Sequence, residues 1–170
     1  MKTIALTPHQ IITLNDYPIY SVETLRMYFS RCQNGQTLPL VPVIRKAIVR
    51  QYFTLELSEE LASFEQANPL ATYFMLDGSH RTTALALTGR DIDVIVYAAD
   101  ADIAEARGLV DTGRVLNNAT LVHSLAENCM ILRQHFQERA YFMTVQQKTE
   151  KLIRDNYIAH YGLLERCNKL

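Results

Sequence analysis

The stretch of residues 71–97 constrains the fold most strongly. It begins with the apolar run ATYFML over residues 71–76, which is typical of a buried strand. An Asp-Gly-Ser turn then leads into a helical pattern over residues 80–87. Residues 91–97 alternate and then run apolar, which indicates a second strand. The order strand, tight turn, helix, strand predicts an α+β fold in which this helix packs on a sheet.

The rest of the chain adds strands before this unit and helices after it. We expect a small mixed sheet built from residues 4–14, 38–45, 71–76 and 91–97, with the helix over 81–88 packed on it. Two prolines in the segment 38–44 place its strand at or near an edge, because proline donates no ladder hydrogen bond. The segment 47–57 is rich in β-branched and aromatic residues and predicts a further strand.

Helical patterns occupy the flanking segments. They cover residues 21–32, 58–67, 101–109, 121–136 and 145–157. We therefore divide the chain into a domain over residues 1–117 and a helical extension over residues 118–170. The extension is expected to form a hairpin or bundle against one side of the domain.

Charge and length exclude several classes of protein. The chain has 170 residues, with 17 Lys and Arg against 18 Asp and Glu. The overall charge of −1 gives no basic footprint for a dedicated DNA-binding protein. No signal peptide and no apolar run of about 18 residues are visible, which predicts a cytoplasmic protein without a membrane partner. Cys32, Cys129 and Cys167 fit no zinc pattern and are expected to be reduced thiols, and no metal site is predicted from side chains alone.

The turn before the helix of residues 80–87 carries the chemistry. Gly78 lies where a strand turns into a helix, and the absence of a side chain there would allow close approach of a ligand. The free N–H groups of a helix start attract anions. Arg81 adds a forked cation suited to phosphate, His80 adds a second donor, and Ser79 and Thr82 add hydroxyls. Together these residues predict a phosphate cradle.

An ordinary structural interpretation of the same residues stays open. Asp-Gly is a common turn, Ser79 can cap the helix, and His80 and Arg81 can be solvated residues of its first turn. Asp77 would repel a bare anion. Its place beside the cradle makes sense if it holds a metal ion or accepts a proton from a substrate.

The motif Asp-Gly-x-His-Arg, followed by a helix with small residues and a strand about ten residues later, resembles the ParB/sulfiredoxin superfamily. The resemblance continues upstream in the helix over residues 21–32 and the proline-containing segment 38–44. The resemblance covers roughly residues 4–45 and 71–116. Residues 46–70 look like an insertion relative to that superfamily.

The resemblance implies nucleotide binding and leaves two kinds of function open. Sulfiredoxins have a cysteine where this chain has Ser79, so their thiol repair is not expected here. The Asp-Gly-x-His-Arg variant resembles free-serine kinases, which implies a phosphotransferase or nucleotide hydrolase that uses ATP, ADP or CTP, with Mg²⁺, on a small-molecule acceptor. The alternative is a ParB-like, nucleotide-gated module that binds DNA or protein, with a helical tail that forms a homodimer.

Residue roles follow from the resemblance position by position. Asp77 matches the motif aspartate, and His80 and Arg81 match the pair that holds nucleotide phosphates. Glu23, the acid on the helix over residues 21–32, is the candidate catalytic base, and Thr24 is a candidate phosphate-binding hydroxyl. A carboxylate such as Glu23 is also favoured at a helix start by the helix dipole alone.

Arg45 and Lys46 follow the proline-containing segment. They either reach a bound phosphate or are solvated charges at a sheet edge.

Overall fold

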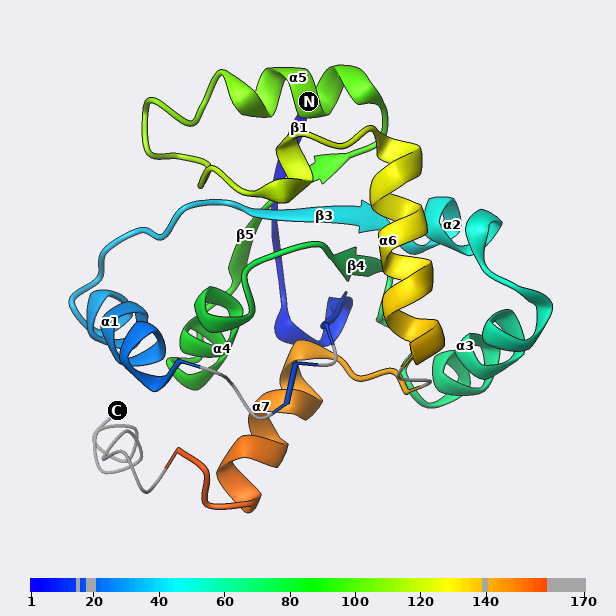
Figure 1. Cartoon of the computed structure of the whole chain (residues 1–170). Coiled ribbons are helices and arrows are strands. Elements are labelled where there is room, and N and C mark those ends of the chain that lie inside the picture. Colours follow the sequence, from blue (N-terminus) through cyan, green and yellow to red (C-terminus); the bar gives the residue numbers. More distant parts are fainter. Residues whose placement is uncertain (15, 18–20, 139–140, 159–170) are drawn as a thin grey trace.

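The computed structural model describes residues 1–14, 16–17, 21–138 and 141–158, and it shows a mixed α+β architecture (Figure 1). One five-stranded sheet has the order β1-β5-β3-β4-β2. Its strands are β1 (Lys2–Leu6), β2 (Ile11–Ile12), β3 (Val41–Arg45), β4 (Tyr73–Met75) and β5 (Ile92–Tyr97). The β1–β5 and β3–β4 pairs are antiparallel, whereas the β3–β5 and β2–β4 pairs are parallel. The predicted fold class is confirmed.

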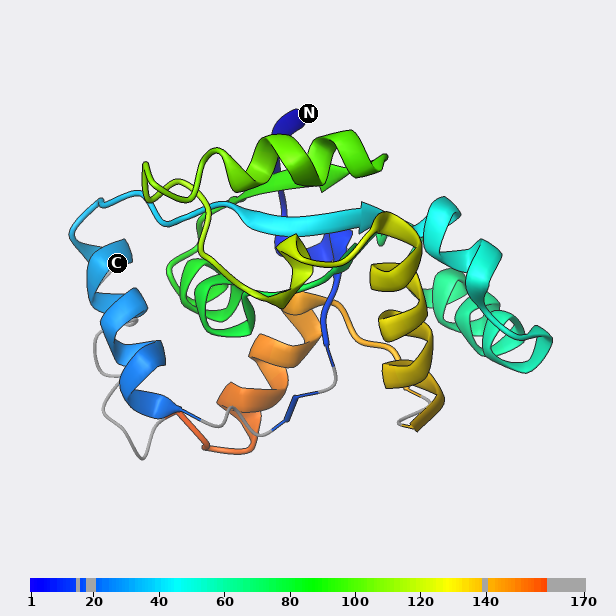
Figure 2. The same cartoon turned by 45° about the horizontal axis from the view of Figure 1, so that its top comes forward.

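Helices cover both faces of this sheet. They are α1 (Val22–Gln33), α2 (Lys46–Val49), α3 (Leu55–Ala67), α4 (Ser79–Leu87), α5 (Asp100–Arg107), α6 (Leu125–Glu138) and α7 (Val145–Arg154). Figures 1 and 2 show α1, α4 and α7 grouped together, with α3 and α6 at the opposite end of the view.

Alternate residues of the central strands belong to two separate cores. Val94 and Val96 of β5 pack with residues of α1, α4 and α7 in one core. Ile95 and Tyr97 pack with residues of α3, α5 and α6 in the other. Two buried faces explain why β5 is nearly continuous in apolar residues, since a strand with one solvated face would alternate.

The predicted strand over residues 4–14 is divided between the two edges of the sheet. β1 pairs with β5 at one edge, and β2 pairs with β4 at the other. Between them lies a 3₁₀ turn over Pro8–Gln10, where the Thr7 backbone N–H donates to Gln10 Oε1 at 2.9 Å. Pro8 has no N–H for a ladder, so the strand stops and the chain crosses the sheet.

The expectation that the segment 38–44 forms a strand at or near a sheet edge is wrong. β3 lies in the middle of the sheet, between β5 and β4. Pro42 is accommodated because β4 ends opposite it: Val43 pairs with Met75, and the next residue, Leu76, donates its N–H to the Pro42 carbonyl at 3.0 Å. Pro42 thus faces the first residue beyond β4, where its missing N–H removes a bond only at the end of the β3–β4 ladder.

The predicted strand over residues 47–57 is also wrong. This segment forms α2, a 3₁₀ turn over Arg50–Tyr52 and the start of α3. Thr54 caps α3, with Oγ1 accepting from the Leu57 N–H at 3.3 Å, so the helix begins before Ser58. Burial of apolar side chains at helical spacing, as at Leu57 and Leu61, outweighs the β propensity of the segment.

The expectation that the helices after residue 118 form a hairpin or bundle against one side of the domain is wrong too. Leu132 and Phe136 of α6 pack in one core, while Val145 and Leu152 of α7 pack in the core on the opposite face of the sheet. The backbone N–H of Thr13 donates to the carbonyl of Met143 at 2.9 Å, in the segment that links the two helices. α7 is thereby brought beside α4.

Within the described residues, no helix combines the length and the apolar composition that crossing a membrane requires.

Candidate functional site

The turn at Gly78 positions the start of α4. Gly78 has φ +113° and ψ 24°, a conformation that residues with a side chain rarely adopt. A Cβ at this position would lie 3.1 Å from Arg81 Nη2 and 3.3 Å from Val41 Cγ2. Glycine is therefore required by the packing of Arg81, whereas the sequence argument attributed it to close approach of a ligand.

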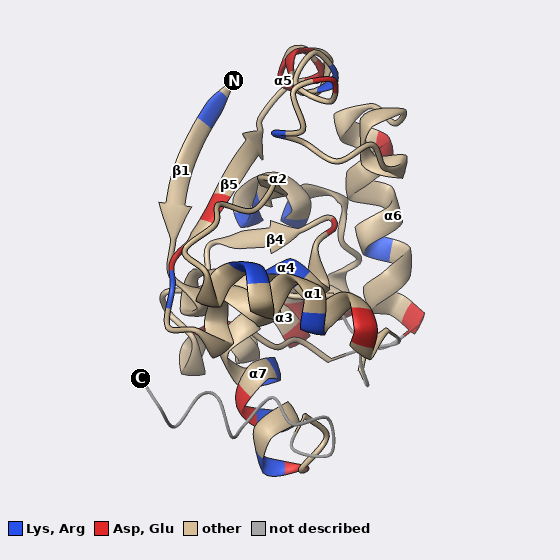
Figure 3. Cartoon of the chain, turned by 90° about the vertical axis from the view of Figure 1, so that its left-hand side faces the viewer, with Lys and Arg blue, Asp and Glu red and all other residues tan. Residues whose placement is uncertain are grey.

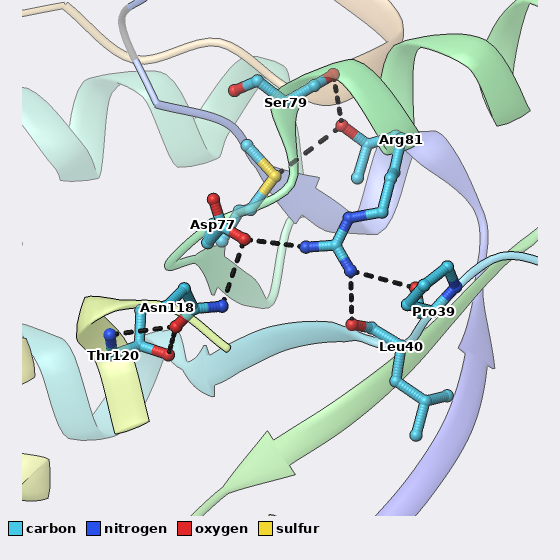
Figure 4. Close-up of polar contacts among 9 residues, drawn as sticks. Pro39, Leu40, Asp77, Ser79, Arg81, Asn118 and Thr120 are labelled. Atoms are coloured by element: carbon cyan, nitrogen blue, oxygen red, sulfur yellow. Dashed lines mark hydrogen bonds and ion pairs between the residues drawn. The ribbon is translucent and has the colours of Figure 1, made fainter. Parts of the chain in front are cut away.

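Arg81 is buried and holds the site together. Its Nη1 donates to the carbonyls of Pro39 at 3.0 Å and Leu40 at 2.7 Å, and its Nη2 donates to Asp77 Oδ2 at 2.7 Å (Figure 4). Arg81 is 1 % exposed, and burial lowers the pKa of its guanidinium, although the neighbouring Asp77 opposes that shift. Much of the hydrogen-bonding capacity of Arg81 is thus used inside the protein.

Asp77 is held from two sides and stays half-exposed. Asn118 Nδ2 donates to the same Oδ2 atom at 3.2 Å, while Asn118 Oδ1 accepts from the backbone N–H of Thr120 at 2.9 Å (Figure 4). The second oxygen, Oδ1, accepts no hydrogen bond from the described residues, and Figure 4 shows it directed away from Arg81. Asp77 therefore retains one oxygen for a proton or a cation.

A cavity of about 350 Å³ opens beside these residues. Its lining is Leu14, Asp16, Thr24, Tyr28, Asp77, Gly78, Ser79, His80, Arg81 and Leu116. The first turns of α1 and α4 both contribute to the wall, so the positive ends of two helix dipoles approach one space. This arrangement favours an anion in the cavity.

Hydroxyl groups lie at both helix starts. Ser79 is 7 % exposed, lines the cavity, and its Oγ atom has no hydrogen-bond partner among the described residues. A buried hydroxyl without a partner costs free energy, and a ligand would supply that partner. Thr24 also lines the cavity, but its hydroxyl lies 2.8 Å from that of Ser21, whose Oγ caps α1 by accepting from the Thr24 N–H at 3.3 Å.

His80 is largely buried in the same wall. Burial lowers the pKa of its imidazole, and the positive charge of Lys148 lowers it further, while the carboxylates of Asp16 and Asp77 act in the opposite direction. His80 is therefore favoured as the neutral imidazole, which can donate a hydrogen bond or take up a proton.

A second buried ion pair flanks the cavity. Lys148 of α7 is 1 % exposed and its Nζ atom donates to Asp16 Oδ1, while the Asp16 side chain keeps 25 % exposure. Burial lowers the pKa of the Lys148 ammonium, and the attraction of Asp16 opposes that shift. Lys148 itself is not a lining residue, so α7 is joined to the cavity wall through Asp16.

Not every predicted site residue lines this cavity. Glu23 is exposed and is not among the lining residues. Thr82 is buried behind the wall, where its hydroxyl donates to the Ser79 carbonyl at 3.1 Å. Lys46 donates to the Ala71 carbonyl at 2.6 Å and pairs with Glu65 at 2.9 Å, and the Arg45 guanidinium lies 6.0 Å from the Tyr73 ring centre. Lys46 is thus held by partners outside the site, and neither Arg45 nor Lys46 lines the cavity.

Sequence reasoning missed several residues of the site. Asp16 lies in an irregular segment with no motif, and Lys148 lies on a helix that showed only apolar periodicity. Asn118 carries a signal that could have been recognised, because Asn before a short turn is a common cap. Nothing in the pattern indicates that its amide would also hold Asp77.

A smaller, mostly apolar cavity of about 170 Å³ lies next to the first. Leu14 lines both cavities, and Leu76, the residue before Asp77, lines the smaller one. Its wall also contains Asn128 and His135 of α6. The larger cavity has charged and hydroxyl-bearing residues in its wall, the smaller one is mostly apolar, and Leu14 lines both.

In the view of Figure 3, the described Lys and Arg residues are not gathered on one face. Figure 3 shows Lys and Arg spread over several elements and interleaved with Asp and Glu. Among the described residues, no group of three or more His, Cys, Asp or Glu is gathered as a metal site. Cys32 and Cys129 are buried free thiols, while Cys167 lies outside the described residues.

Comparison with protein-family models, with curated proteins and with solved structures finds no match. The resemblance to the ParB/sulfiredoxin superfamily therefore stays a prediction from the motif.

Proposed function

We propose that this chain binds the phosphate groups of a nucleotide in the cavity at the start of α4 and acts as a phosphotransferase or nucleotide hydrolase. The observation that carries the proposal is the buried, unpartnered Ser79 hydroxyl at the wall of a cavity that two helix N-termini share. A phosphate oxygen satisfies the hydroxyl and the first-turn N–H groups together.

The neighbouring apolar cavity supports a nucleotide over a simple phosphate. A nucleotide is anionic at one end and carries a flat, largely apolar base at the other. Leu14 lines both cavities, so a nucleotide in this site would place its phosphates in the larger cavity and its base toward the smaller one. ATP, ADP and CTP all have this form.

Asp77 is the residue proposed to orient the attacking group in phosphoryl transfer. Its Oδ2 is fixed by Arg81 and Asn118, which leaves Oδ1 to orient an acceptor hydroxyl or water as it attacks the terminal phosphoryl group. A Mg²⁺ ion that accompanies nucleotide phosphates takes one or two carboxylates from a protein, and Asp77 fits that need. Such an ion would neutralise charge on the phosphates. Glu23, being exposed and outside the cavity lining, is not part of this proposal.

The test is calorimetric titration with ATP, ADP and CTP in the presence of Mg²⁺, together with an assay for phosphate release or transfer. Ser79→Ala should weaken binding about 2- to 10-fold, the value of a typical hydrogen bond. The matched control is Ser63→Ala on α3, whose hydroxyl bonds only the Glu59 carbonyl at 3.2 Å and is exposed. Equal affinity of both variants and the natural chain would contradict the assignment.

Asp77→Asn separates catalysis from binding. It should abolish turnover while nucleotide affinity changes far less, because the Asp77 carboxylate acts on the attacking group. Binding without turnover in the natural chain would instead support the nucleotide-gated binding module.

A further inference from the structure

Two carboxylates line the cavity that is proposed to bind an anion. It is lined by the carboxylates of Asp16 and Asp77, and its lining cation, Arg81, already bonds two backbone carbonyls and Asp77. Each carboxylate is thus neutralised by its own cation, Asp77 by Arg81 and Asp16 by Lys148. A phosphate group that brings up to two negative charges finds no unassigned cation among the described lining residues, so its binding needs a change of partners.

The Asp16–Lys148 pair is the one suited to such a change. Asp16 lines the cavity and is partly exposed, whereas Arg81 is fixed by three hydrogen bonds. Among the described residues, Lys148 forms one ion pair, with Asp16, and it lies near enough to His80 for its charge to lower the pKa of that imidazole. An ammonium on a flexible stem also exchanges partners more readily than a guanidinium held in a rigid fork.

The burial of Lys148 is difficult to explain by stability alone. Moving an ammonium into a protein interior is costly, and a buried ion pair is often no more stable than apolar residues of the same volume. Lys148 nevertheless lies 1 % exposed on α7, whose other buried residues are Val145, Thr149 and Leu152. This cost is understandable if the ammonium is held for a ligand.

We propose that Lys148 is the phosphate-binding cation of this site and that the Asp16 carboxylate occupies it as an internal anion until ligand phosphate replaces it. The inference rests on the proposed function and identifies which charges of the same cavity select an anionic ligand. The C-terminal helix α7 thereby becomes part of the binding site.

The two residues of the pair should then affect binding in opposite directions. Asp16→Asn removes the competing carboxylate and should tighten binding of inorganic phosphate and ADP on the order of tenfold, from the interaction of unit charges near a protein surface. Lys148→Met removes the cation and should weaken binding by a similar factor, while Lys148→Arg should retain much of it. A purely structural pair predicts losses from both single substitutions.

The experiment is calorimetric titration of the full chain with inorganic phosphate and with ADP, alongside thermal unfolding. The double variant Asp16→Asn/Lys148→Met leaves no unpaired charge and keeps the test valid if Lys148→Met alone does not fold. It should bind phosphate more weakly than Asp16→Asn. The matched control is Lys46→Met/Glu65→Gln, which removes a pair remote from the cavity lining and should leave affinity unchanged.

The outcomes distinguish this inference from the proposed function. If the natural chain binds ADP but Asp16→Asn binds it no more tightly, or if the double variant equals Asp16→Asn, the partner exchange is refuted and the site stands. If neither the natural chain nor Asp16→Asn binds phosphate or ADP, the proposed function itself fails.

Discussion

Replacement of Gly78 by alanine tests whether Arg81 and the turn before α4 form one unit. A side chain at φ +113° costs about 1–2 kcal/mol in backbone strain. The new Cβ would also lie 3.1 Å from Arg81 Nη2 and 3.3 Å from Arg81 Nε. Because three hydrogen bonds hold Arg81, moving it adds about 1–2 kcal/mol. The expected loss in the free energy of unfolding is about 2–4 kcal/mol.

Gly89→Ala is the matched control. Gly89 also has a positive φ, +65°, but a Cβ there has nothing within 4 Å, so only the strain of about 1–2 kcal/mol should appear. Urea unfolding followed by circular dichroism measures both values. In an Arg81→Met background the excess loss at Gly78 should shrink, because the obstructing guanidinium is gone. Equal losses at Gly78 and Gly89 would refute the packing argument.

Three further predictions concern buried polar groups. Arg81→Met should lower the free energy of unfolding by about 3–5 kcal/mol, since it removes the donor to two backbone carbonyls and the cation paired with Asp77. Exposed Arg45→Met should change it by less than about 0.5 kcal/mol in the same urea assay. The lowered pKa of His80 means that the unfolded chain takes up this proton at a higher pH than the folded chain does. The free energy of unfolding should therefore fall as the pH drops below about 6.5. Between about pH 5 and 7, its change with pH should be smaller in His80→Gln than in the natural chain. Exposed His9→Gln should show the same pH dependence as the natural chain. Burial raises the pKa of the Cys129 thiol to about 11. A variant that keeps Cys129 as its only cysteine should therefore react with a thiol reagent at about pH 7 far more slowly when folded than when unfolded in denaturant. Equal rates in the two states would contradict the burial of this thiol.

Local signals predicted the part of the fold that surrounds the site. The apolar run at 71–76, the Asp-Gly turn and the helical pattern after it all lie within one short stretch, and the structure has β4, the turn at Gly78 and α4 in that order. The spacing of apolar residues and the residues of the turn were sufficient to predict these elements, because each element is specified by its own residues.

Long-range partners could not be predicted in the same way. The proline rule placed β3 at or near an edge, since nothing in the sequence indicates that Pro42 lies opposite the end of β4. The Asp16–Lys148 pair joins residues 132 positions apart, and neither belongs to a motif. Arg81 was identified as a site residue, but its bonds to the Pro39 and Leu40 carbonyls depend on how β3 enters the sheet.

The most direct test of the account is to locate the bound phosphate on the protein. Backbone amide resonances of ¹⁵N-labelled chain are followed during titration with ADP and Mg²⁺. The account predicts that the largest shifts occur at the first turn of α4, at Ser79 and His80, and at Thr24 at the start of α1, with smaller shifts on α3. Saturable shifts confined to another surface, or no shifts at millimolar ADP, would contradict the claim that this cavity binds nucleotide phosphate.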